Sequence, residues 1–583
     1  MTLRRKTMNF KTKKIIIAIV MVVVILAGVI VGAVLATNKP EPTTTTPEST
    51  TTTTSGTTTT SKNTYSDFSK YDQSLSKDEI LERYTLTREE IDSALAMLDD
   101  LVALSNTAST VDEIDALYEE FEDVFYHIAQ QMTFASLVYY CDMSDEEATT
   151  RHLDTTDMFY EVQDKYMISC RTMYLESPFS EELFADWTEQ EINELLEYDP
   201  AITELKKEIK ELETIYNDLS ESKFEKESVN IYKQIIEKNN KIARHFGYAN
   251  YYDYASERVY GRDYEKEDLK QFKEYVIEYI MPRFSKLNNG FMAYQDLSTT
   301  RYDLFYSYVA GEFDSVSNNK NYLLMYLNSL GDTNMGVAMR DVFESKNCVF
   351  SSSGNSHPTA FQTYLYEDET PFCLFGSNGQ GSSTMVHEIG HYYAAYTNDD
   401  LNNYDLCETH SQGNEFLFLQ FCKDELPSKV YSPIRYYNLF NAYYVIVVAT
   451  VMDDFEQRVY SLDDRTIKNM TSEDFDALMD EVLLDYGKNA EWFETNLTNV
   501  YDYWRNVVID NPVYYISYAV SAVAAVEIFS IAEEDYDAAM QAYTTLVEGV
   551  TEEDGFLEAL RKAGLTTPFE EETFKKVAAT MRK

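Results

Sequence analysis

The clearest chemical signal in this 583-residue chain is a pair of histidines four residues apart, in the run His387-Glu388-Ile389-Gly390-His391. In a helix, residues four apart lie on one face, so both imidazoles can reach the same metal ion. Neutral imidazole suits tetrahedral zinc, and a catalytic zinc takes three protein ligands and leaves a fourth position for water. Glu388 would take a proton from that water and later pass it to the leaving amine. The pattern predicts zinc-dependent hydrolysis of a peptide bond, with one Zn²⁺ per chain.

The third metal ligand must come from another part of the chain. The best candidate is Glu408, which lies 17 residues beyond His391. If this segment is helical, Glu408 and Glu415 share a face while His410 points away from it. We therefore predict that Glu408 binds the zinc and that Glu415 lies behind it and orients a ligand. Glu415 as the ligand is the first alternative, followed by Asp405 and His410.

Four stretches of sequence, taken in order, resemble one family of enzymes. They are residues 240–254, residues 371–391 with the HExGH pattern, residues 408–415 with the pattern Glu-x-His-Ser, and the tyrosine-containing residues 510–521. Together they resemble the thimet oligopeptidase and oligoendopeptidase F family of zinc metallopeptidases. The resemblance runs from about 230 to 530, and the helical stretch 80–230 is compatible with it without being diagnostic. Because many peptidases share HExxH alone, the order of the four stretches is the more specific signal.

The resemblance implies a large helical body in two lobes with a deep channel, which admits short unfolded peptides and excludes folded proteins. It supports Glu408 as the third ligand. It also implies that tyrosine hydroxyls hydrogen-bond the developing oxyanion, a donor role worth about 2.7–4 kcal/mol in comparable sites. Tyr514 and Tyr518 are the first candidates for this role, and Tyr515 with Tyr518 is the alternative pair. Family members often carry a histidine five residues before the proline of the last stretch, where this chain has Val507.

The elements that must position these residues are mainly helices. Only 19 glycines and 12 prolines occur, which favours long uninterrupted helices. Capping-box patterns begin at Thr87 and Thr188, and apolar residues three and four apart across 202–219 predict a long helix packed on a neighbour. Strand patterns predict one small sheet directly before the metal-binding helix, at residues 347–350, 363–366 and 371–375.

The segment just before the histidines suggests how a substrate is held. Residues 371–376 are interpreted as an edge strand, along which a peptide could pair by backbone hydrogen bonds. The glycines at 376, 379 and 381 would let the following loop approach a ligand or flex over it. The alternative is that these glycines only make a tight turn between strand and helix.

The composition excludes several classes of protein. The 99 acidic residues outnumber the 49 basic ones and give a formal charge of −50, which excludes a nucleic-acid-binding protein because phosphate contacts need clustered Lys and Arg. Six cysteines without CxxC spacing exclude a zinc ribbon, a dithiol redox site and a disulfide-dense scaffold. The hydrophobic fraction of 44% excludes a disordered chain.

The amino terminus predicts a membrane anchor. Residues 1–14 form a basic cytoplasmic tail, and residues 15–36 are uncharged and apolar, about 33 Å long as a helix and so able to cross a bilayer. A signal peptide is the alternative interpretation of this run. Basic residues ahead of the span place everything after it outside the cell. A Thr- and Pro-rich linker at 37–63 then leads to an extracellular peptidase at 64–583, with its catalytic core at about 340–530.

Three hypotheses of function follow. The first is a membrane-anchored, extracellular zinc endopeptidase that acts on oligopeptides. The second is a zinc carboxypeptidase of similar helical fold, which would remove residues one at a time from the carboxyl end. The third is a non-catalytic surface binding protein with a relic metal site, a hypothesis that the Val507 departure motivates.

Overall fold

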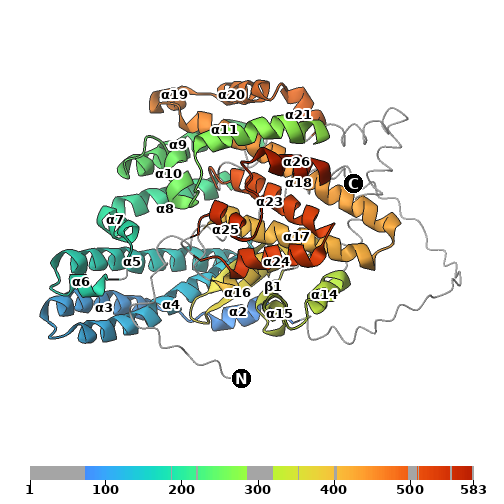
Figure 1. The fold of residues 1–583 in the computed structure, drawn as a ribbon. Coiled ribbons are helices and arrows are strands. Elements are labelled where there is room, and N and C mark those ends of the chain that lie inside the picture. The colour runs from blue at the N-terminus through green and yellow to red at the C-terminus, as the bar shows by residue number, and fades with distance from the viewer. Residues whose placement is uncertain are drawn as a thin grey trace.

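The structure is a computed structural model that describes residues 73–284, 320–398, 403–496 and 509–580, apart from short gaps at 186, 218, 220, 352, 510 and 552–553. These described residues are mainly helical with one small sheet, as predicted (Figure 1). Within these described ranges, no helix is both long and apolar enough to span a bilayer. The predicted anchor at 15–36, the linker at 37–63 and Val507 lie outside the described residues and stay predictions.

The amino-terminal part is a group of packed helices. They are α2 (Lys77–Arg83), α3 (Arg88–Thr107), α4 (Val111–Cys141), α5 (Glu146–Glu176), α6 (Ser180–Leu183) and α7 (Glu189–Glu197). Thr87 and Thr188 make the predicted capping boxes at the starts of α3 and α7. Helices α3, α4 and α5 pack on one another around a buried cluster that includes Leu98, Phe121 and Phe159. In Figure 1 they lie side by side at the lower left.

The middle of the chain supplies further helices, two of them with π geometry. They are α8 (Pro200–Asn217), α9 (Glu221–His245), α10 (Tyr251–Tyr254), the π-helix η4 (Ala255–Val259), α11 (Lys266–Tyr275), the π-helix η5 (Val276–Ile280), α14 (Lys320–Ser329) and α15 (Asn334–Glu344). The apolar periodicity predicted across 202–219 lies on α8, where Ile202, Ile209 and Tyr216 are buried. Helix α8 packs against α9, so the predicted helix and neighbour are both confirmed.

One three-stranded sheet precedes the histidine helix. Its strands are β1 (Cys348–Phe350), β2 (Ala360–Leu365) and β3 (Thr370–Phe375), in the order β1-β3-β2. Strand β3 pairs with β1 in parallel and with β2 antiparallel. The three strands are confirmed, but the prediction that 371–376 is an edge strand is wrong, because β3 is paired on both sides. Its unbroken apolar run is the pattern of a strand buried on both faces.

The carboxy-terminal half contains the histidine helix. Its helices are α16 (Ser382–Thr397), α17 (Tyr404–Glu425), α18 (Ser428–Tyr460), α19 (Asp464–Asn469), α20 (Ser472–Asp485), α21 (Ala490–Asn496), α23 (Ile516–Ala532), α24 (Tyr536–Glu548), α25 (Phe556–Lys562) and α26 (Glu571–Thr580). Helix α16 packs against the sheet and α17. Helix α23 is apolar on every side, as expected of a buried helix, and contacts α17, α18, α24 and α26. The two-lobed body with a deep channel stays a prediction from the resemblance.

Candidate metal centre

The loop between β3 and α16 is a tight turn. A Cβ atom at Gly376 would lie 1.9 Å from the backbone oxygen of His357, and one at Gly379 would lie 2.6 Å from that of Thr359. The backbone N–H groups of Gly376 and Ser377 donate to the oxygens of Thr359 and His357 at 2.8 and 3.1 Å. The glycines therefore allow the loop to pack closely on its own chain, which favours the turn over a loop that flexes across a ligand.

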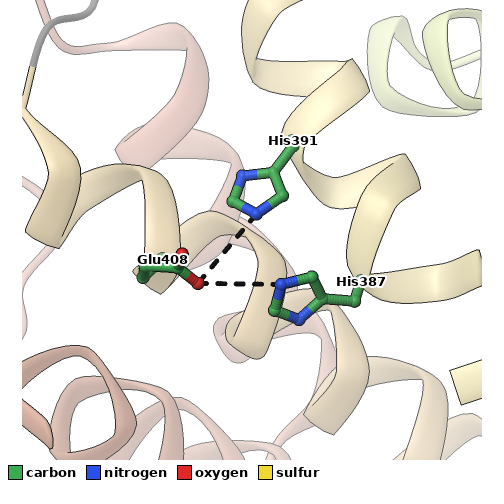
Figure 2. A group of neighbouring side chains, drawn as sticks. All are labelled: His387, His391 and Glu408. Carbon is green, nitrogen blue, oxygen red and sulfur yellow. Dashed lines mark ion pairs between the residues drawn. The ribbon is translucent and has the colours of Figure 1, made fainter. Parts of the chain in front are cut away.

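Helix α16 presents the two histidines together, and α17 brings a carboxylate to them. The Oε2 atom of Glu408 lies 3.6 Å from Nε2 of His387 and 4.0 Å from Nε2 of His391. Figure 2 shows the two imidazoles, from one helix, and the carboxylate, from another, directed toward one another. One ligand atom from each residue lies within 4.8 Å of the others, so the structure brings together the three predicted ligands.

These three groups fit a zinc ion. Ligand atoms about 2.0 Å from a tetrahedral zinc are about 3.3 Å apart, and the separations of 3.6 and 4.0 Å are close to this spacing. Two imidazoles and one carboxylate are a donor set found at catalytic zinc sites, with one position left open. Only 1% of the Glu408 side chain is exposed, and burial raises the pKa of this carboxyl group. A cation held beside it would offset the cost of burying its charge.

The ligands are themselves held by hydrogen bonds. Nδ1 of His387 lies 2.7 Å from Oε1 of Glu415, which leaves Nε2 to face Glu408. The hydroxyl of Tyr514 donates to Oε1 of Glu408 at 2.6 Å, and that of Ser411 donates to Oε2 at 3.3 Å. Such outer partners fix the orientation of metal ligands. Glu415 thus lies behind His387 rather than behind Glu408, where its carboxylate can orient the imidazole.

The buried charges of the centre shift one another's pKa values. Burial lowers the pKa of His387, but its hydrogen bond to Glu415 and the nearby carboxylates outweigh burial and raise this pKa to about 9. Burial and the charge of His387 hold the pKa of His391 well below its usual value. Burial, with the charges of Glu408 and Glu415, raises the pKa of Glu388 to about 7 despite the opposing charge of His387. A carboxyl group with such a pKa can exchange protons near neutral pH.

The close contact of α16 and α17 sets the distance between the histidines and Glu408. A Cβ atom at Gly390 would lie only 2.8 Å from Cα of Ser411, so only glycine lets the two helix backbones come this close. Asn414 on α17 donates to the backbone oxygen of Val386 at 2.7 Å and accepts from the hydroxyl of Tyr326 at 2.8 Å. Sequence reasoning missed Asn414. A glycine inside a helix, which costs about 1 kcal/mol relative to alanine, was the available signal for the close approach.

The alternative ligands lie elsewhere. His410 is buried with its Nε2 3.2 Å from the backbone oxygen of Leu546, on the side of α17 that faces α24. Asp405 is buried with its Oδ1 4.0 Å from Nε of Arg262. Among the described residues, the group of potential metal ligands contains neither His410 nor Asp405. The carboxylate of Glu415 is hydrogen-bonded to Nδ1 of His387, on the side of the imidazole away from Glu408.

The three predicted tyrosines have different surroundings. The hydroxyl of Tyr514 is directed at Glu408, so its contact is with a predicted metal ligand. The ring of Tyr518 packs edge-on against that of Tyr514 with centroids 5.2 Å apart. Burial raises the pKa of Tyr518, and the charges of Glu408 and Glu388 act in the same direction. The ring of Tyr515, at the start of α23, lies 5.9 Å from that of Tyr518.

Comparisons with known proteins agree with the sequence resemblance. Residues 81–199 match the family model described as the Peptidase M3 N-terminal domain. From the sequence alone, this region is compatible with the family without being diagnostic of it. No protein with curated annotation matches the chain.

Solved structures share the fold over most of its length. Pz peptidase A bound to an inhibitor matches with a TM-score of 0.67 and 18% identity, over 86% of this chain and 99% of that one. A Bacillus anthracis str. Ames structure described as an oligoendopeptidase F matches with a TM-score of 0.64 and 17% identity, over 86% of this chain and 97% of that one. Oligoendopeptidase F from Enterococcus faecium matches with a TM-score of 0.51 and 12% identity, over 85% of this chain and 98% of that one. The chain has the fold of these peptidases, and its resemblance to the oligoendopeptidase F family is confirmed.

Proposed function

We propose that this protein is a zinc-dependent endopeptidase that hydrolyses peptide bonds in short, unfolded oligopeptides. The observation that carries the proposal is the meeting of His387, His391 and Glu408, with the buried Glu388 on the same helix. The match to the M3 amino-terminal domain and the fold shared with oligoendopeptidases support a peptidase.

A zinc ion held by the three ligand atoms would supply Lewis acidity toward the scissile carbonyl and the attacking water. Glu388 acts as the general base that accepts a proton from the water, and then as the acid that gives this proton to the leaving amine. Its raised pKa of about 7 suits both steps, because the group can hold and release a proton at neutral pH.

Tyr518 is the tyrosine best placed to donate a hydrogen bond to the developing oxyanion. Burial keeps its hydroxyl protonated, and its ring packs against that of Tyr514, whose hydroxyl contacts Glu408. Tyr514 and Tyr518, the first candidates for donors to the oxyanion, therefore take different roles. Tyr514 holds Glu408 in position, and Tyr518 acts on the substrate.

The size limit on substrates and the location are further parts of the proposal. The resemblance to oligopeptidases motivates a preference for short peptides over folded proteins. The apolar run at 15–36, with basic residues before it, motivates an anchor that leaves the catalytic part outside the cell.

The experiment that tests the proposal is digestion of a mixed peptide library. The purified protein and its Glu388→Gln variant are incubated with peptides of about 6–15 residues, a length range suited to an oligopeptidase site. Products are read by mass spectrometry. Internal cuts that are absent from the variant support an endopeptidase. Stepwise loss of carboxy-terminal residues shifts the assignment to a carboxypeptidase, and no cleavage by folded, zinc-loaded protein favours the binding protein with a relic site.

A further inference from the structure

The position of Tyr514 depends on a strained piece of backbone just before α23. Val513 has a φ of 70°, in the left-handed region. For a β-branched residue this conformation is strained and persists only where the surroundings hold it. The next residue, Tyr514, places its hydroxyl 2.6 Å from Oε1 of Glu408. Whatever holds Val513 therefore also sets the contact of Tyr514 with a metal ligand.

Three buried side chains from distant parts of the sequence bind this backbone. The hydroxyl of Tyr260 donates to the oxygen of Pro512 at 2.7 Å. Nη2 of Arg262 donates to the oxygen of Val513 at 2.7 Å, and Oε1 of Glu456 accepts from the N–H of Val513 at 2.7 Å. We call Tyr260, Arg262 and Glu456 the Arg262 clamp. It satisfies both backbone groups of the strained residue.

The backbone around Tyr260 and Arg262, two residues of the Arg262 clamp, has an unusual local geometry. The π-helix η4 ends at Val259, and Gly261 then takes a left-handed φ of 60°. π-Helical turns are rare and often lie at functional sites. The backbone oxygen of Gly261 accepts from Nδ2 of Asn403 at 3.0 Å, and Asn403 also caps the start of α17, the helix of Glu408. The segment that carries Tyr260 and Arg262 therefore contacts the start of α17 as well as the backbone before α23.

Arg262 is the member whose chemistry is hardest to replace. Its side chain is 1% exposed, and Nη2 also donates to Oγ of Ser517 at 3.1 Å. Its Nε lies 4.0 Å from Oδ1 of the buried Asp405, whose charge it faces. A guanidinium donates in several fixed directions at once, whereas a lysine ammonium in the same place keeps the charge and loses that geometry.

We propose that Arg262 is a positioning residue of the metal centre, which acts through Val513 and Tyr514 to hold Glu408 in its ligand orientation. The inference rests on the proposed zinc function and goes beyond it, because Arg262 touches neither the metal ligands nor the reacting groups in this arrangement. Its removal changes the affinity for zinc rather than only the stability of the fold.

The test measures equilibrium zinc affinity by competition with a chelator, with thermal unfolding of the metal-free protein alongside. The variants are Tyr514→Phe, Arg262→Lys and the double variant, and Tyr260→Phe removes one bond of the clamp without changing a charge. The matched control is Arg258→Lys, because Arg258 lies on η4, four residues before Arg262, but bonds Tyr248 and pairs with Glu194, away from α23.

We expect Tyr514→Phe to weaken zinc binding by about 10- to 100-fold, the usual effect of losing an outer partner of a ligand. Arg262→Lys should weaken it by at least about fivefold and add little to Tyr514→Phe, since both act on one path. Tyr260→Phe should weaken it in the same direction, and Arg258→Lys should not. If Arg262→Lys does not fold, Tyr260→Phe decides.

The inference is overturned if folded Arg262→Lys, or Tyr260→Phe in its place, binds zinc within about twofold of the unmodified protein, or if its effect adds fully to that of Tyr514→Phe. Failure of the proposed function has a different signature. In that case the unmodified protein itself binds no zinc or cuts no peptide, whatever the variants do.

Discussion

Replacing Gly390 by alanine should damage the metal centre while leaving the fold in place. The new Cβ atom would lie 2.8 Å from Cα of Ser411 and 2.9 Å from the backbone oxygen of His410. Both are backbone atoms of α17, so neither can turn aside as a side chain would. The two helices must therefore move apart at this contact.

The size of the effect follows from these distances. Carbon atoms in contact prefer about 3.5–4.0 Å, so α17 must shift by about 0.7–1.2 Å at Ser411. Overpacking of this kind costs about 1–3 kcal/mol, and the better helix propensity of alanine returns about 1 kcal/mol, so the net loss of stability is about 0–2 kcal/mol. Glu408, one turn before Ser411, moves with the helix. Its distances of 3.6 and 4.0 Å from the imidazole nitrogens then depart further from the roughly 3.3 Å of a zinc site.

The assay is zinc affinity by chelator competition, with thermal unfolding of the metal-free protein as a second readout. We expect Gly390→Ala to bind zinc at least about tenfold more weakly, a loss of about 1.4 kcal/mol. Gly413→Ala is the matched control, because a Cβ atom there meets side-chain atoms, the nearest in the ring of Tyr543 at 3.1 Å, rather than the backbone of a neighbouring helix. If folded Gly390→Ala binds zinc as tightly as this control, the idea that helix separation sets the ligand distance is refuted.

Further predictions concern activity and pH. Glu388→Gln should keep zinc and lose about 10²- to 10⁴-fold in kcat, because the proton carrier is gone. Tyr518→Phe should lose about 10²- to 10³-fold in kcat with little change in KM, as expected for a donor that acts in the transition state. A strong chelator should abolish peptide cleavage and lower the thermal midpoint, and added Zn²⁺ should restore both. Burial lowers the pKa of His357 to about 4, whereas the unfolded chain takes up the proton near 6.5. The contribution of His357 to the free energy of unfolding is therefore fully present above about pH 6.5 and is lost as the pH falls toward 4, by up to about 3 kcal/mol. His357→Phe should reduce this pH dependence of the free energy of unfolding.

Each of these has a contrary result. Turnover by Glu388→Gln near the unmodified rate would remove Glu388 as the base. A Tyr518→Phe variant that changes KM alone would assign that hydroxyl to substrate binding. Full activity after verified removal of metal would contradict metal-dependent hydrolysis. An unchanged unfolding profile between pH 4 and 6.5 in His357→Phe would mean that the histidine is not buried in its neutral form.

Much of the fold was readable from local patterns. The capping boxes at Thr87 and Thr188 begin helices because they satisfy backbone N–H groups within one turn, whatever the rest of the chain does. The three strands were found from short apolar runs between turn residues. Their order cannot be read in this way, because pairing joins residues that the local pattern does not connect, and β3, predicted as an edge strand, lies in the centre of the sheet.

For the metal centre, the sequence by itself determined the two histidines and Glu388, because the spacing of four residues guarantees a common helical face. Only the tertiary structure decided among the carboxylates, through the crossing of α16 and α17 that puts Glu408 beside the histidines and leaves Asp405 beside Arg262. Tertiary structure also gave Tyr514 its partner. A helical period repeats within one element, whereas these contacts depend on how closely separate elements pack, and that is set by small residues and buried polar groups far apart in the chain.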